Sequence, residues 1–162
     1  GSAHIPWLFS HPRNMTMQLS RLQKLTLGLS GLVAFTIGAF ILVSPQAFYA
    51  SYGITLNRDP NLLSELRAPG AGLATLGATM LLGLGRRAMT PVAVVAAFAV
   101  YLAFPLGRLV SLAVDGVPSG SILAALAIEI VIACLLLTAF GQRRARAPVA
   151  ESIADLPSRS QG

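Results

Sequence analysis

Apolar residues dominate four stretches of the chain, at about 20–44, 60–85, 91–114 and 120–140, and short polar segments separate them. A helix that crosses a membrane needs about 20 consecutive, mostly apolar residues, and each stretch meets that length. The pattern therefore predicts an all-α protein in which a transmembrane four-helix bundle occupies residues 18–141.

Helix-start and turn signals lie between the apolar stretches. The Asp-Pro and Thr-Pro dipeptides at 59–60 and 90–91 each offer an N-cap side chain followed by proline in the first turn. Ser119 or Ser121 is placed to cap the fourth helix. The sequence DGVPSG at 115–120 predicts a tight turn, so helices three and four are expected to be antiparallel neighbours.

Composition supports a membrane location. Hydrophobic residues make up 54% of the chain and charged residues 11%, whereas a soluble domain is about 25% charged. The net charge is +6, but the basic residues sit at segment ends and form no stripe interleaved with aromatic residues. We therefore expect the lipid bilayer, and no nucleic acid, as a partner.

The positions of lysine and arginine predict the topology. Cytoplasmic loops are enriched in these residues. Arg58 lies in a loop on one side, and nine basic residues fall on the other: Arg13, Arg21, Lys24, Arg86, Arg87, Arg143, Arg144, Arg146 and Arg159. Both termini are therefore expected in the cytoplasm of a multi-pass protein of the bacterial plasma (inner) membrane, with the 45–59 and 115–119 loops facing outward.

The two ends of the chain are set apart from the bundle. Residues 1–17 are interpreted as an N-terminal extension, either native or left from cloning. Residues 142–162 are polar and basic and are expected to form a mostly disordered cytoplasmic tail. The first apolar stretch is long for a signal peptide, and bulky Phe48 would occupy the −3 position of its cleavage site, so we favour a retained helix.

Candidate metal and redox ligands are scarce. Cys134 is the single cysteine, and its place in an apolar run indicates a small buried side chain. His4 and His11, the only histidines, both lie in the N-terminal extension. We expect no intramolecular disulfide, no metal site and no cofactor.

Four charged residues, Glu65, Arg67, Arg108 and Glu129, lie inside or near the apolar stretches. Each costs about 2.5–3.5 kcal/mol at the centre of a bilayer if it is unpaired, so these side chains are expected to face inward and pair. Residues two apart on a helix point about 200° from each other. Pairs between helices are therefore expected, above all Arg108 with Glu129 or Glu65. Asp115 shares a helix face with Arg108.

Prolines add polarity near these charges. Pro69 and Pro105 cannot donate to the carbonyls of Glu65 and Tyr101, and in lipid such acceptors must be satisfied by protein or water. The sequence thus predicts a small polar cavity in the outer half of the bilayer, with a rim that includes Tyr49, Tyr52 and Tyr101.

Small residues recur every four positions on two of the predicted helices and indicate close helix packing. They are Ser30, Ala34 and Gly38 on the first, and Ala71, Thr75, Thr79 and Gly83 on the second.

Several functions fit these features. The charge network, including Asp115, Tyr101 and Tyr52, is either purely structural or lines a pocket for a small lipophilic molecule or a partner membrane subunit, such as a second copy of the chain. The alternative is a cofactor-independent intramembrane enzyme of the isomerase, cyclase or epoxide-opening type. Glu65 and Glu129 would then serve as acid and base, with Arg67 and Arg108 as anion stabilisers. A transporter ranks last, because four helices are few for alternating access.

Three segments carry a family resemblance: "FYASYGITLNRDPNL", the following "SELRAPGAGLATLGA", and "GRLVSLAVDGVPSGSILAALAIEI". Over about 20–140 the chain resembles small bacterial four-helix membrane proteins of unknown function, and its layout is similar to that of the DoxX/DoxD-like group. The most specific matches are Glu-x-Arg-Ala at 65–68, Gly-Arg at 107–108, Asp-Gly at 115–116, and Glu129. The resemblance implies a four-helix membrane bundle and leaves the activity open.

Overall fold

The computed structural model describes the backbone of residues 18–154 and the side chains of residues 18–141. Four helices are long and apolar enough to cross a membrane. They are α1 (Arg21–Val43), α3 (Pro60–Gly85), α4 (Thr90–Val114) and α5 (Gly120–Ala154). No strand occurs within the described range, so the prediction of an all-α fold with four spans is confirmed there.

Two short helices, which the sequence reasoning missed, join the long ones. Helix α2 (Pro45–Ala50) follows α1 directly, and the 3₁₀ helix η1 (Arg87–Met89) links α3 to α4. Pro45 stands in the first turn of α2, where proline fits because the N–H groups of a first turn have no partner within the helix. The segment predicted as an outward loop at 45–59 is therefore helical in its first part.

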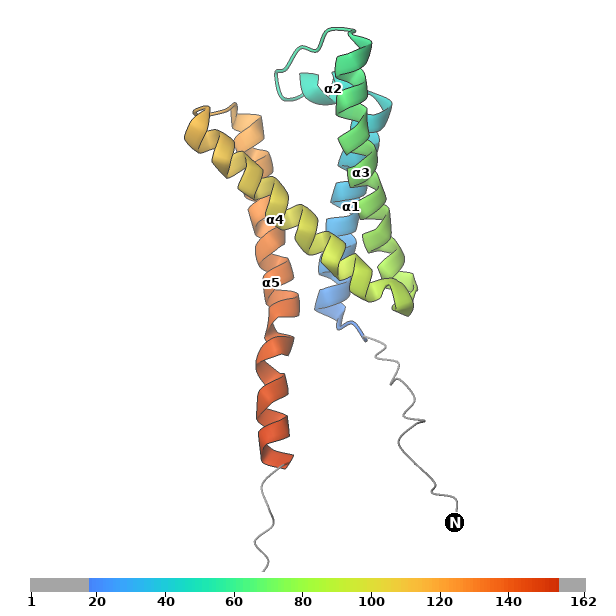
Figure 1. Ribbon diagram of the computed structural model, residues 1–162, viewed down its shortest axis with the longest axis vertical. Coiled ribbons are helices and arrows are strands. Elements are labelled where there is room, and N and C mark those ends of the chain that lie inside the picture. The colour runs from blue at the N-terminus through green and yellow to red at the C-terminus, as the bar shows by residue number, and fades with distance from the viewer. Residues whose placement is uncertain (1–17, 155–162) are drawn as a thin grey trace, which may run out of the picture.

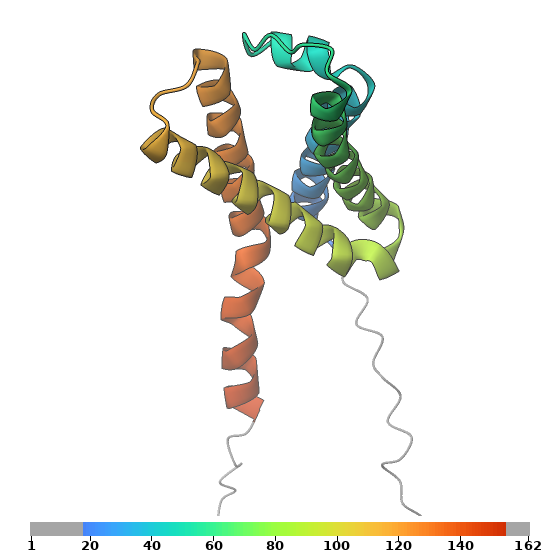
Figure 2. The same cartoon turned by 45° about the horizontal axis from the view of Figure 1, so that its top comes forward.

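The long helices run alternately up and down, so that α2 lies at one end of the four-helix bundle and η1 at the other, and the last part of α5 extends beyond η1 (Figure 1). We call these the α2 end and the η1 end. Helices α1 and α3 lie side by side, whereas α4 crosses obliquely from the η1 end of α3 toward the start of α5 (Figures 1 and 2). Among the described residues, α5 packs against α1 and α4 and makes no close backbone contact with α3.

Glycines set the close approach of α1 and α3. A Cβ added at Gly31 would lie 2.9 Å from Cβ of Met80, and one at Gly70 would lie 2.7 Å from Cγ2 of Ile41. A Cβ at Gly38 would overlap the backbone of Ala74. Since only glycine leaves room for such contacts, van der Waals packing between the two backbones holds this pair of helices together.

The small-residue row was right for α1; on α3 it was right for Gly83, which is buried against Ala93 of α4, and wrong for Thr75. Ser30, Ala34 and Gly38 are buried as predicted. On α3, however, Thr75 is exposed, and its hydroxyl donates to the carbonyl of Ala71 in the same helix. At about 100° per residue, positions four apart drift by about 40° per step, so a row of them leaves the interface. Positions seven apart drift by only about 20°. The contact face of α3 accordingly carries Gly70 and Gly77.

The closed core lies in the η1 half of the molecule. Its most deeply buried apolar side chains come from all four long helices: Leu27, Met80, Ala93, Ala97 and Leu136. At the same end the Gln23 side-chain amide donates to the carbonyl of Ala139 at 2.8 Å and ties α1 to α5. This bond is buried, so it fixes α5 against the bundle at its η1 end.

The outside of the bundle is apolar. Leu25 is 72% exposed, and Val95 and Leu106 are exposed to a similar degree. Cys134 is also exposed, so the prediction that it is buried was wrong: it sits on the outer face of α5. Large apolar side chains spread around a helical surface are typical of helices that face lipid. This surface therefore agrees with the membrane-spanning length of the helices.

Helix ends match the sequence signals in part. Asp59 caps α3 as predicted, because its carboxylate accepts from the N–H of Asn61 at 2.8 Å. Thr90 does not cap α4. It is the first residue of that helix, and its buried hydroxyl donates to the carbonyl of Gly83 at 2.9 Å, so it links α3 to α4 instead.

Helix α5 continues beyond its predicted end at 140. The part suited to cross a membrane ends at Gly141, and the helical backbone runs on to Ala154. It thereby enters the segment 142–162 that we expected to be mostly disordered. Residues 142–147 read QRRARA and include several strong helix formers, which favour this continuation. Residues 155–162 and the N-terminal extension at 1–17 lie outside the described residues. Disorder of the tail therefore stays a prediction for 155–162.

Replacing Gly38 by alanine tests the α1–α3 contact. The new methyl group would overlap the backbone of Ala74, so Gly38→Ala should lower the free energy of unfolding by about 1–3 kcal/mol. Gly72→Ala is the matched control, because nothing lies within 4 Å of a Cβ at that position, and alanine favours a helix by about 1 kcal/mol over glycine. Thermal unfolding in detergent, followed by circular dichroism, measures both. Equal melting temperatures for the two variants would contradict the packing described here.

Candidate functional site

A cavity of about 670 Å³ occupies the α2 half of the molecule between α1, α4 and α5. Ligand pockets in proteins typically measure about 300–1,000 Å³. Its lining comes from every helix except η1 and is mostly apolar: Val33, Ala34, Ile37, Ile41, Phe48, Tyr49, Ser51, Tyr52, Ile54, Leu73, Val100, Tyr101, Phe104, Arg108, Ser121, Ile122, Ala124, Ala125, Ile128 and Glu129. A cavity was predicted at this end, but the prediction that it is polar was wrong.

The cavity exists because one face of α5 changes along its length. In the η1 half this face carries Ile132 and Leu136, which are buried in the core. In the α2 half the same face carries Ser121 and Ala125, which line the cavity. Small side chains cannot span the widening gap that oblique α4 creates, so the space stays open.

Tyr101 forms the floor. Its side chain is 3% exposed, and its hydroxyl donates to the carbonyl of Ser30 in α1 at 2.8 Å. The residue therefore ties α4 to α1 at the level where the closed core gives way to the cavity. The sequence placed Tyr101 at the rim, whereas the structure places it at the bottom.

Aromatic side chains of α2 and the adjoining turn form the roof. The ring of Phe48 lies 5.2 Å from the rings of Tyr49 and Tyr52, and 5.6 Å from that of Phe40. Ser119, just before α5, donates to the carbonyl of Tyr52 at 3.4 Å. The two loops expected on the outer side thus meet at the α2 end, and Tyr52 lies at the cavity as predicted.

Arg108 and Glu129 form an ion pair in the cavity wall. The Nε–H of Arg108 points between the two carboxylate oxygens of Glu129, at 3.1 Å from Oε1 and 3.0 Å from Oε2. The side chains are 30% and 15% exposed, respectively. This is one of the two pairings that the sequence left open for Arg108, and it joins α4 to α5 in the half of the molecule where the two helices flank the cavity.

The pair leaves hydrogen-bonding capacity unused. A guanidinium carries five N–H donors, and a carboxylate has about four acceptor positions. No described residue accepts from the two terminal nitrogens of Arg108. An occupant of the cavity would therefore meet donors of Arg108 next to acceptors of Glu129.

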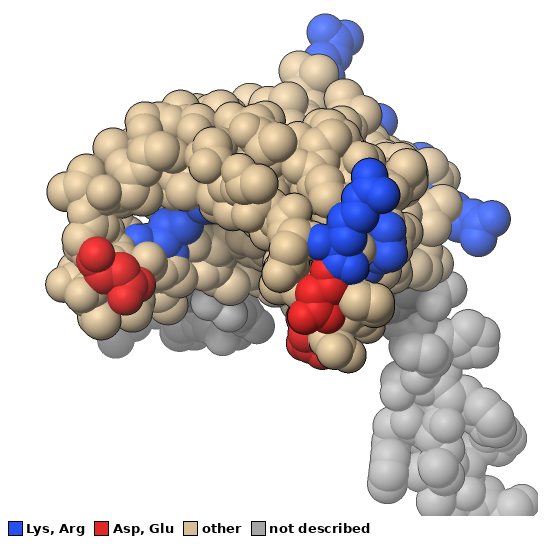
Figure 3. Space-filling view, turned by 90° about the horizontal axis from the view of Figure 1, so that it is seen from above, with Lys and Arg blue, Asp and Glu red and all other residues tan. Residues whose placement is uncertain are grey.

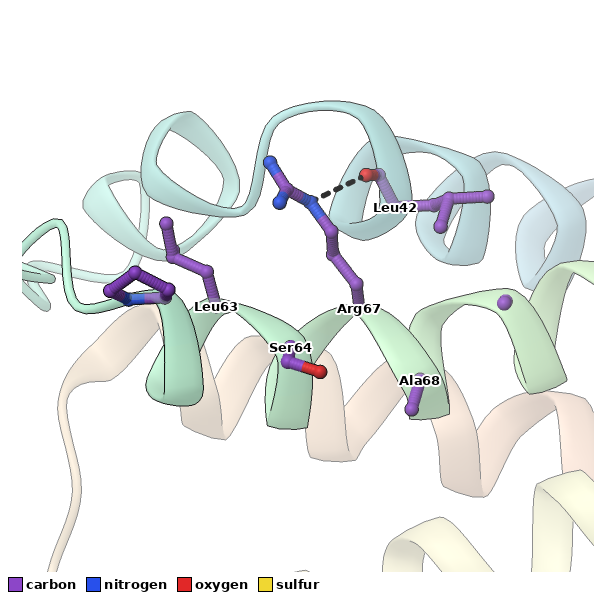
Figure 4. Close-up of a pocket in the computed structure, with 7 residues that line it drawn as sticks. Leu42, Leu63, Ser64, Arg67 and Ala68 are labelled. Carbon is purple, nitrogen blue, oxygen red and sulfur yellow. Dashed lines mark hydrogen bonds between the residues drawn. The ribbon is translucent and has the colours of Figure 1, made fainter.

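Glu65 and Arg67 do not join this site. The Nε–H of Arg67 donates to the carbonyl of Leu42, at the end of α1, at 3.2 Å. Figure 4 shows the guanidinium reaching from α3 toward that carbonyl. Arg67 lines a separate hollow of about 540 Å³, whereas Glu65 is exposed and belongs to neither hollow. Since the two residues point apart on α3, the four charges do not form one network.

Asp115 also stands apart. Its carboxylate accepts from the hydroxyl of Ser111, one turn earlier in α4, at 2.8 Å, and both residues are exposed. From the shared helix face, Arg108 was a possible neighbour of Asp115. A hydroxyl from the last turn takes that place, which makes Asp115 part of the helix end and the turn at Gly116.

Charges at the α2 end gather in two places. Figure 3 views this end from above and shows red acidic groups beside blue basic groups on two sides of an uncharged surface. Within the described part of the chain, no group of three or more His, Cys, Asp or Glu side chains is close enough to hold a metal ion.

Removing one partner of the Arg108–Glu129 ion pair should lower the free energy of unfolding more than removing both partners. Arg108→Leu or Glu129→Leu leaves one charge unpaired in the wall and should lower the free energy of unfolding by about 1–3 kcal/mol, since both side chains are partly exposed. The double variant should recover most of that loss. The exposed Glu65→Gln is the control and should change stability by less than about 0.5 kcal/mol. Thermal unfolding of the four variants and the natural chain is measured in one detergent. The two single variants and the double variant give the coupling energy between Arg108 and Glu129, and a coupling energy near zero would refute the pair.

Comparison with known proteins identifies a family whose function is unknown. No curated protein and no solved structure matches the chain. The match that was found is to a domain of unknown function, DUF4345, over residues 22–140. It covers most of the chain, from the first turn of α1 to the end of the fourth span, and includes every residue of the cavity wall. The chain therefore belongs to the DUF4345 family.

Proposed function

We propose that this protein is a multi-pass membrane protein that binds a small lipophilic molecule in the cavity between α1, α4 and α5. One observation carries the proposal: an apolar cavity of about 670 Å³ has one ion pair among its described lining residues, and the donors and acceptors of that pair are only partly used. Binding sites for small molecules combine an apolar wall with a few polar groups that orient the ligand. The ion pair supplies such groups here.

The proposed orientation puts the α2 end outside and both termini in the cytoplasm of a bacterial inner membrane. Arg21 and Lys24, at the start of α1, and Arg86 and Arg87, next to η1, belong to the η1 end. The enrichment of basic residues on the cytoplasmic side supports this orientation. The cavity then lies in the outer half of the bilayer.

A small molecule suits the cavity better than a partner subunit does. The cavity has a floor at Tyr101 and a roof at α2, and its wall comes from several helices. A partner helix needs a long groove, whereas a volume of about 670 Å³ lies in the range of pockets for small molecules. A second copy of the chain would instead use the apolar outer surface of the bundle.

The enzyme alternative has less support. It requires two carboxylates at one site, but Glu129 lines the cavity whereas Glu65 is exposed on α3. An enzyme at this site would have to use Glu129 alone as acid or base, while Arg108 binds both of its oxygens. We therefore propose binding as the primary function.

Filling the cavity should displace its ligand. Ala125→Trp places a large ring in the cavity, and Ala127→Trp on the same helix is the matched control, because Ala127 is exposed and does not line the cavity. Both variants and the natural chain are purified in a mild detergent, and copurified lipophilic molecules are identified by mass spectrometry. We expect a compound that is enriched with the natural chain and with Ala127→Trp, and depleted about tenfold or more with Ala125→Trp, which corresponds to a loss of about 1.4 kcal/mol in binding.

Thermal unfolding of the same samples shows whether each variant folds. If no compound is enriched over a control membrane protein, or if the folded Ala125→Trp variant retains it fully, the proposed function is wrong.

A further inference from the structure

The charges of the cavity wall restrict the ligand, and this inference rests on the function proposed above. Among the described residues that line the cavity, Arg108 is the one base and Glu129 the one acid. They neutralise each other through the bonds from Nε to both carboxylate oxygens. The wall is therefore electrically neutral, although it contains two ions.

A charged ligand would upset this balance. An anion at the terminal nitrogens of Arg108 would also lie close to the carboxylate of Glu129, and a cation at Glu129 would lie close to the guanidinium. In either case one charge would remain uncompensated in apolar surroundings, which is strongly unfavourable. No second charged side chain of the described wall is present to offset it.

A neutral polar group fits the wall better. The terminal nitrogens of Arg108 donate and the carboxylate of Glu129 accepts, and Nε of the same guanidinium already contacts both carboxylate oxygens. A hydroxyl oxygen accepts one hydrogen bond and donates another, so it matches both partners at once. An ether or ester oxygen accepts only, and a plain hydrocarbon does neither.

We propose that the ligand is an uncharged amphiphile, in which a hydroxyl or another group that both donates and accepts contacts Arg108 and Glu129 and an apolar chain fills the rest of the cavity. The apolar wall formed by Val33, Ile37, Phe104 and Ile128 takes the chain.

Four photoreactive probes of one chain length test the proposal. They are tetradecanol, its methyl ether, tetradecyl sulfate and tetradecyl trimethylammonium, each with a diazirine in the chain. The full-length protein in lipid nanodiscs is irradiated with each probe, and labelled peptides of α1, α4 and α5 are quantified by mass spectrometry. The alcohol should label cavity residues about fivefold more than the ether, because it makes one hydrogen bond more, and the two charged probes should label them least.

A charge variant sharpens the test. Glu129→Gln keeps an acceptor for Arg108 but leaves the cavity wall with a net positive charge. In this variant the probe that labels the cavity most strongly should therefore change from the alcohol to the sulfate. Ala125→Trp should remove the cavity labelling by the alcohol, and Ala127→Trp should retain it.

The outcomes separate the two proposals. Equal cavity labelling by all four probes, or strongest labelling by the sulfate or the ammonium probe in the natural chain, overturns the neutral-ligand inference and leaves the proposed binding function standing. If no probe labels the cavity, and the Ala125→Trp variant also retains the copurified compound in full, both proposals are overturned.

Discussion

The ion pair between Arg108 and Glu129 is the interaction on which the cavity half of the structure depends. Two charges in membrane-spanning helices must compensate each other, because an unpaired charge in apolar surroundings is costly. Nε of Arg108 meets both oxygens of Glu129, so the pair joins α4 to α5 in the cavity wall, in addition to the short turn between the two helices. It also places unused donors and acceptors in an otherwise apolar wall.

The remainder of the bundle supplies a rigid frame for this opening. Glycines bring α1 and α3 into backbone contact, and Gln23 fixes α5 at the η1 end. Tyr101 ties α4 to α1 at the floor of the cavity. The α1–α3 contact runs along both halves of the molecule, whereas Gln23 holds α5 only at the η1 end, so α4 can cross obliquely and leave space between α1 and α5 in the other half. The same chain therefore combines a close-packed core with a cavity of ligand size, and the fold and the site have one cause.

The sequence was informative wherever a strong physical rule acts locally. The four spans followed from apolar length and the start of α3 from Asp59. The cost of unpaired charge predicted that Arg108 pairs with a carboxylate of another helix, although it did not decide between Glu129 and Glu65. It failed where the outcome depends on the orientation of whole helices. Positions that recur every four residues suggested Thr75 as a contact, whereas the interface uses Gly70 and Gly77. The apolar character of the cavity, too, depends on the tilt of α4, which no local pattern reports.

The most direct test of this account is an experimental structure of the full-length protein in lipid nanodiscs. We expect α5 to touch α1 only near the η1 end, Arg108 and Glu129 to be paired, and elongated density between α1 and α5 to reach the guanidinium of Arg108. A structure in which α5 packs along the whole of α1, with the cavity closed and Arg108 turned away from Glu129, would contradict the account.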